Sequence, residues 1–86
     1  MVLKHIKNDL TKELNKMIFE EEDGSTIEVP ITAMAIAKYT NDDRYYLFLC
    51  DKNWDVQNDY LLDNIEESME FAETNFGICK GDWLDS

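Results

Sequence analysis

Residues 26–39 read TIEVPITAMAIAKY, and apolar side chains recur at every second position of this stretch. A period of two is typical of a β-strand, because successive side chains point to opposite faces of a sheet. The first half alternates apolar with polar residues, and the second half is apolar on both faces. Pro30 cannot donate a hydrogen bond to a neighbouring strand, so we expect it at a sheet edge or a bulge.

Two more strands are predicted downstream, each after a short turn cluster. Residues 40–43 (TNDD) are turn-forming, and residues 44–50 (RYYLFLC) are apolar on both faces, which suits a central strand. Residues 51–53 form a second turn, and residues 54–62 (WDVQNDYLL) supply a third strand, broken near Asn58. Short connections between consecutive strands predict an antiparallel meander.

The segment that precedes these strands has helical spacing instead. Its apolar residues are three and four positions apart and form one stripe: Leu3, Ile6, Leu10, Leu14, Met17 and Ile18. We therefore predict an amphipathic helix over residues 2–18. The acidic run at residues 20–23, followed by Gly24, ends this helix and serves as a solvated connector.

A second helix is predicted from Asp63 onwards. Asp63 is followed three residues later by Glu66, which resembles a capping box, and Gly77 lies where a left-handed cap is needed. One side of this helix is apolar, through Ile65, Met69, Ala72 and Phe76. After it, Trp83 and Leu84 are expected to anchor the end of the chain against the core.

These elements predict a single α+β domain that spans residues 1–86. Its expected architecture is an N-terminal helix, a three-stranded antiparallel meander and a C-terminal helix packed on one face of the sheet. Eighty-six residues are too few for two separate cores, and an apolar content of 44 % is sufficient for one.

The formal net charge of −11 is the strongest compositional signal. It argues against direct binding to nucleic acid, which needs clustered lysine and arginine, and against an anionic membrane surface. No apolar run is long enough to span a membrane, and the first residues lack a secretion signal, so we expect a cytoplasmic protein. Cys50 and Cys79 are then expected to be reduced thiols.

Catalytic and metal-binding motifs are not recognisable in the chain. Asp51, Asn53, Asp55 and Asp59 resemble the start of a calcium loop, but Val56 and Leu62 occupy the positions that need glycine and glutamate. A hairpin turn accounts better for this stretch. One histidine and two distant cysteines make no transition-metal cluster, and no phosphate loop or nucleophile motif is present. We therefore expect no enzyme activity, no cofactor and no metal.

The closing helix carries an acidic ridge on one side. Advancing about 100° per residue places four glutamates side by side: Glu66, Glu67, Glu70 and Glu73. This ridge is either a solvated surface or a site that meets lysines and arginines of a partner, with Phe71 as an apolar anchor or packed over the sheet edge. Asp55 and Asp59 extend the ridge if their hairpin lies alongside.

Residues 45–83 resemble a group of small bacterial proteins. The resemblance rests on three features: the hairpin YYLFLCDKNWDV, the helix within DYLLDNIEESMEFAETNFGI, and the closing Asp82-Trp83 pair. Some proteins of this group resemble immunity proteins of bacterial toxin systems. The resemblance implies a non-enzymatic protein that binds and blocks a toxin.

Two functional hypotheses follow from these observations. The first is an acidic module that binds a cationic protein, such as an immunity factor against a nuclease-like toxin. The second is a structural or assembly module that forms a homodimer. Residues 1–18 carry four lysines and only two acids, so they are positive while the rest of the chain is strongly negative. This asymmetry gives self-association an electrostatic basis.

Overall fold

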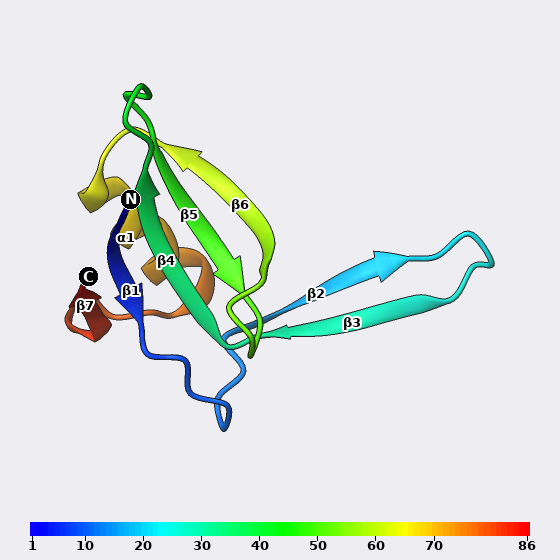
Figure 1. Ribbon diagram of the computed structural model, residues 1–86. Helices are drawn as coiled ribbons and strands as arrows, with labels where there is room; N and C mark the ends of the chain where they lie inside the picture. Colours follow the sequence, from blue (N-terminus) through cyan, green and yellow to red (C-terminus); the bar gives the residue numbers. More distant parts are fainter.

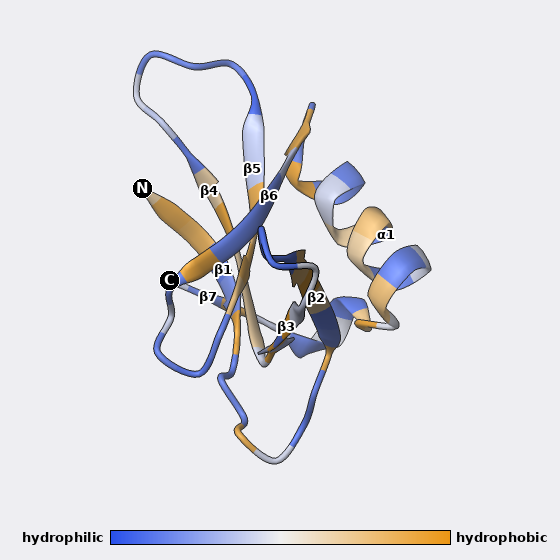
Figure 2. Cartoon of the chain, turned by 90° about the vertical axis from the view of Figure 1, so that its right-hand side faces the viewer, coloured by the Kyte–Doolittle hydropathy of each residue, from blue (hydrophilic) through white to orange (hydrophobic).

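The structure, a computed structural model that describes residues 1–86, is built on a five-stranded antiparallel sheet with one helix on one face (Figures 1 and 2). A separate two-stranded hairpin extends away from this body (Figure 1). The elements in chain order are β1 (Val2–Ile6), β2 (Asn15–Glu20), β3 (Thr26–Ile31), β4 (Ala33–Lys38), β5 (Tyr45–Cys50), β6 (Val56–Leu62), α1 (Ile65–Phe76), a 3-10 turn η1 (Lys80–Asp82) and β7 (Trp83–Asp85).

The order of strands in the main sheet is β6-β5-β4-β1-β7. Short turns join β4, β5 and β6, whereas β1 and β7 come from opposite ends of the described chain and pair with each other. Lys4 of β1 lies opposite Ile36 on one side and Asp85 on the other. The Lys4 ammonium also forms an ion pair of 2.7 Å with the Asp85 carboxylate. The two ends of the chain therefore complete one edge of the sheet.

The predicted α+β architecture, with its N-terminal helix, is wrong: the chain is mostly β, with seven strands and one α-helix. Residues 2–18 form β1, a loop and the first part of β2. Within the loop, the Asp9 carboxylate accepts hydrogen bonds from the backbone N–H and the hydroxyl of Thr11, a local turn that competes with a helix. Pairing with distant strands overrides the helical spacing of the apolar residues.

The stretch at residues 26–39 forms two strands and not one. The chain turns at Thr32, so that β3 pairs with β2 in the hairpin while β4 enters the main sheet. Pro30 lies in β3, in a two-stranded ribbon where each strand has a free edge, which agrees with its inability to donate to a second neighbour. The change in burial pattern along the stretch marks this division.

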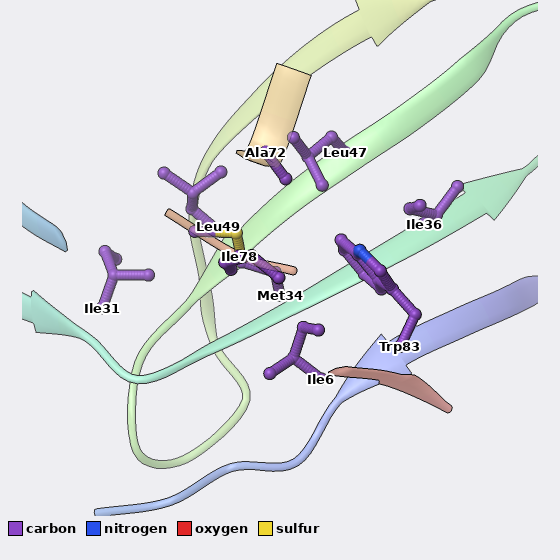
Figure 3. Close-up of a cluster of buried hydrophobic side chains, with 9 residues drawn as sticks. All are labelled: Ile6, Ile31, Met34, Ile36, Leu47, Leu49, Ala72, Ile78 and Trp83. Atoms are coloured by element: carbon purple, nitrogen blue, oxygen red, sulfur yellow. The ribbon is translucent and has the colours of Figure 1, made fainter. Parts of the chain in front are cut away.

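The core lies between the sheet and α1 (Figure 3). Alternate residues of β4 and β5 point into it, and residues from both ends of the chain close it. The nine buried members of the cluster are Ile6, Ile31, Met34, Ile36, Leu47, Leu49, Ala72, Ile78 and Trp83. Trp83 anchors the C-terminal segment as expected, but Leu84 does not, because its side chain is 46 % exposed on the other face of the sheet.

Helix α1 is capped by Asn64 and not by Asp63. The Asn64 side-chain oxygen accepts a hydrogen bond of 2.8 Å from the backbone N–H of Glu67. Gly77 ends the helix in the left-handed conformation, at φ 70°, and Ile78 folds back so that its N–H donates to the Ala72 carbonyl. Neither this helix nor any other is long and apolar enough to cross a membrane.

Replacing Asn64 by alanine removes this cap, and we expect the free energy of unfolding to fall by about 1 kcal/mol. For a domain of this size, the melting temperature then drops by roughly 4–8 °C. Asp63→Ala is the matched control, because the Asp63 carboxylate does not accept a hydrogen bond from any backbone N–H of the helix. We expect that variant to lose only a few tenths of a kcal/mol. Thermal unfolding followed by circular dichroism compares the two, and equal losses would contradict the assignment of the cap to Asn64.

Candidate functional site

The side of α1 that faces the sheet contains small and apolar residues. Ser68 and Ala72 are completely buried, which allows the helix backbone to approach β5 closely. The Ser68 hydroxyl donates to the Asn64 carbonyl within the helix, so its polar atom is satisfied there. Ile65, Met69 and Phe76 pack against the core on either side of this contact line. The remaining side of the helix faces solvent.

The acidic ridge lies on this solvent side. Its four glutamates, Glu66, Glu67, Glu70 and Glu73, are all exposed. Glu70 forms the only ion pair, 3.9 Å from the Lys80 ammonium, and the two side chains are 65 % and 57 % exposed. An exposed pair at this distance contributes little to stability, because water screens it. The ridge is therefore not neutralised by the chain's own lysines.

Phe71 is packed over the sheet edge and is not a free anchor on the surface. Its ring centroid lies 4.8 Å from that of Tyr60 on β6 and 6.0 Å from that of Phe76. The side chain is half-buried against the core. The sequence allowed two placements of Phe71, an exposed anchor or a ring packed over the sheet edge. The structure has the second, with Phe71 covering the edge strand β6.

A shallow hollow of about 240 Å³ lies between the acidic ridge and strand β6. Leu62 and Phe71 provide its apolar lining, while Glu67 and Glu70 place carboxylates beside it. Thr74 and Asn75 complete the wall, and the Asn75 amide is held by a hydrogen bond to the Phe71 carbonyl. In the hollow, negative charge and apolar surface therefore lie close enough together for a single side chain of another molecule to contact both.

Asp55 and Asp59 do not join this hollow. Asp59 lies opposite Phe48 in the sheet, and Phe48 is on the face away from α1, because its neighbours Leu47 and Leu49 point into the core. Asp55 lies in the turn between β5 and β6, where its N–H donates to the Asp51 carboxylate. The structure thus brings together the four glutamates of the ridge and separates the two aspartates from them.

Asp51 organises the β5–β6 turn that the sequence pattern assigned to a hairpin. Its carboxylate accepts hydrogen bonds from the backbone N–H groups of Asn53 and Asp55 and from the Gln57 amide. Trp54 adopts the left-handed conformation at φ 64° to complete the turn. The oxygen that would be a first calcium ligand is thus engaged in turn formation. No group of three or more metal-ligating side chains occurs elsewhere in the structure.

Helical spacing in the sequence could have identified most, but not all, of the residues that line the hollow. Thr74 and Asn75 follow Glu67, Glu70 and Phe71 at intervals of three and four residues, so they lie on the same side of the helix. Leu62 could not be found in this way, because it belongs to a strand, and its position depends on how α1 packs. No protein-family model, curated protein or solved structure matches the chain.

The two cysteines are free and differ in environment. Cys50 is buried on β5, and burial, followed by the nearby Asp51 and Asp55 carboxylates, raises the pKa of its thiol to about 11. Cys79 is exposed beyond the end of α1. Thiolate is the reactive form, so the two thiols are expected to react at very different rates.

Titration with Ellman's reagent at about pH 8 should therefore modify one thiol rapidly and the other only when the protein unfolds. At this pH a thiol with a pKa of about 11 is thiolate in only about one molecule in a thousand, and burial further restricts access of the reagent to Cys50. Cys79→Ser should abolish the rapid phase, and Cys50→Ser should preserve it. Two thiols reacting at the same rate in the folded protein would contradict the buried position of Cys50.

Proposed function

We propose that the protein is an acidic, non-catalytic module that binds a cationic protein through the ridge on α1. The observation that carries this proposal is the hollow beside Glu67 and Glu70, where carboxylates border the apolar surface of Leu62 and Phe71. A lysine or arginine has a matching character, with an apolar stem that ends in a positive charge. Such a side chain buries its stem on the apolar surface and pairs its head with the carboxylates.

The charge of the whole chain supports the same assignment. At −11 it attracts a cationic partner over several ångströms and increases the rate of encounter. The three glutamates of the ridge without an ion pair, Glu66, Glu67 and Glu73, are available to set the orientation of that partner. Because Phe71 is packed inward, its contribution is the apolar lining of the hollow and not an inserted anchor.

The partner class that fits best is a protein with a surface evolved to bind phosphates, such as a nuclease-like toxin. An acidic protein can cover such a surface and block it, which is the role of an immunity protein implied by the resemblance of residues 45–83. We place this activity in the cytoplasm, where two free thiols persist. A toxin-like reading frame beside the gene would supply the natural partner for the experiment below.

The proposal is tested by titrating the protein with a synthetic peptide that carries several arginines, followed by amide chemical shifts. We expect the largest shifts at Glu67, Glu70, Phe71, Thr74 and Asn75. The double variant Glu67→Gln/Glu70→Gln should raise the dissociation constant about tenfold, equivalent to about 1.4 kcal/mol. Loss of two charge-assisted hydrogen bonds in a partly apolar site accounts for this magnitude.

Asp55→Asn/Asp59→Asn is the charge-matched control, because it also removes two negative charges but lies away from the hollow. Its dissociation constant should stay within about twofold of the native value, as expected for screened charges at a distance. If both double variants weaken binding equally, or if the shifts spread over the whole surface, binding is due to net charge alone and the assignment to the ridge is wrong.

A further inference from the structure

Strand β6 forms one edge of the main sheet and has no strand on its outer side (Figure 1). It runs from Val56 to Leu62 and pairs only with β5, whereas the opposite edge consists of the three residues of β7. Along an edge strand, every second residue directs its backbone N–H and C=O away from the sheet. Strand β6 is therefore the longer of the two free edges of the main sheet.

The backbone groups of Asp59 and Leu61 face this outer side. The Asp59 N–H donates a hydrogen bond of 2.9 Å to the side-chain oxygen of its neighbour Asn58, as expected for a group with no strand beside it. Direction alternates along a strand, so the N–H and C=O of Leu61 face the same edge, and neither takes part in a backbone hydrogen bond outside the ladder. Leu61 is also 47 % exposed. Its backbone is therefore free to pair with another extended chain, which presents matching groups at the same spacing.

The hollow on α1 opens beside the same edge. Leu62, the last residue of β6, lines it together with Phe71, and the carboxylates of Glu67 and Glu70 border it. The Phe71 ring centroid lies 4.8 Å from that of Tyr60, which places this side of α1 against the edge strand. A strand added to β6 would lie about 5 Å further out. Its residue opposite Leu62 would point to the same face of the sheet as Leu62, and thus into the hollow.

We propose that the partner segment bound at the α1 hollow is an extended basic peptide that adds to β6 as a sixth strand of the main sheet. This inference rests on the proposed function and specifies the conformation of the partner. The peptide backbone pairs with that of Leu61, antiparallel to β6, as in every other pair of this sheet. A lysine or arginine opposite Leu62 enters the hollow and pairs with Glu67 and Glu70. Main-chain hydrogen bonds provide affinity, and the carboxylates select a basic residue.

A second copy of this chain fits the edge less well than a basic segment does. Both copies carry a net charge of −11 and the same unneutralised ridge, so two such edges repel each other as they approach. Basic residues at alternate positions of an added strand instead place positive charge on its α1 side, beside Glu67 and Glu70. The carboxylates next to the edge therefore favour a basic partner over a copy.

Two N-methylated forms of one peptide test the strand addition. The parent is a peptide of about eight residues in which arginine and threonine alternate, so that all arginines point to one side of the extended chain. In the proposed register the arginines face α1, and each threonine directs its N–H towards β6. Methylation of the threonine nitrogens removes these donors, whereas methylation of the arginine nitrogens removes only N–H groups that face solvent. Both forms have the same side chains, charge and number of added methyl groups.

Threonine methylation should raise the dissociation constant at least about tenfold, because the N–H groups that pair with β6 are lost and the methyl groups collide with its backbone. Arginine methylation should leave the dissociation constant within about threefold of the parent value, since its methyl groups lie in solvent. Isothermal titration calorimetry at near-physiological ionic strength measures both values. Equal effects of the two methylation patterns, or a larger effect of arginine methylation, would overturn the antiparallel addition.

Amide hydrogen exchange of Leu61 supplies an independent measurement on the native protein. We expect this N–H to exchange quickly in the free protein, since it lacks an acceptor, and to slow at least about tenfold when the parent peptide is bound at saturation. The Tyr60 N–H, which faces β5, is the internal control and should stay protected throughout. Slow exchange at Leu61 without peptide would show that a second copy covers the edge. Unchanged exchange with the peptide bound would show that the peptide contacts only side chains. Either result overturns the strand addition.

Failure of the proposed function has a different signature. If Glu67→Gln/Glu70→Gln weakens binding of the parent peptide but the methylation pattern has no effect, the ridge assignment stands and the strand addition is wrong. If threonine methylation weakens binding but the glutamine variant does not, the peptide pairs with β6 and the ridge assignment is wrong.

Discussion

Strand β4 must be buried on both faces, and the rest of the structure follows from this constraint. On one face, Met34 and Ile36 point into the core beneath α1. On the other, Ala33, Ala35 and Ala37 are at most 6 % exposed although no helix covers them. Their small size lets neighbouring aromatic rings cover the strand, with Phe48 opposite Ala35 and Tyr46 opposite Ala37. Because a central strand of this kind needs a neighbour on both edges, β5 pairs on one side and β1 on the other.

The sequence was informative where each element is determined by near neighbours. The strands at residues 45–62 and the helix that ends at Gly77 could be predicted, because short turns, alternation and a left-handed cap are local signals. Residues 2–18 were misread as a helix. Their apolar spacing is helical, yet in β1 Val2 pairs with Ala37 and Ile6 pairs with Trp83, far along the chain. No local pattern reveals such partners. The ridge glutamates were correctly grouped by helical spacing, whereas the position of Phe71 depended on the packing of Tyr60.

The proposed binding surface on α1 combines charge with apolar area. Glu67 and Glu70 place carboxylates beside an apolar hollow on a rigid helix, an arrangement that suits a cationic side chain of another protein.

The pairing of β1 with β7 has a further consequence for how the protein reaches its native state in the cell. The ribosome makes β1 first, yet its neighbour β4 follows roughly thirty residues later and its other neighbour, β7, lies 81 residues away, as the ion pair of Lys4 with Asp85 records. Strands β4, β5 and β6 all precede Trp83 in the chain, so they can pair before β7 is available. Contacts of such high sequence separation slow folding. Until the C-terminal residues join β1, that edge of the nascent sheet therefore stays open, and an open strand edge is a template for pairing with another chain.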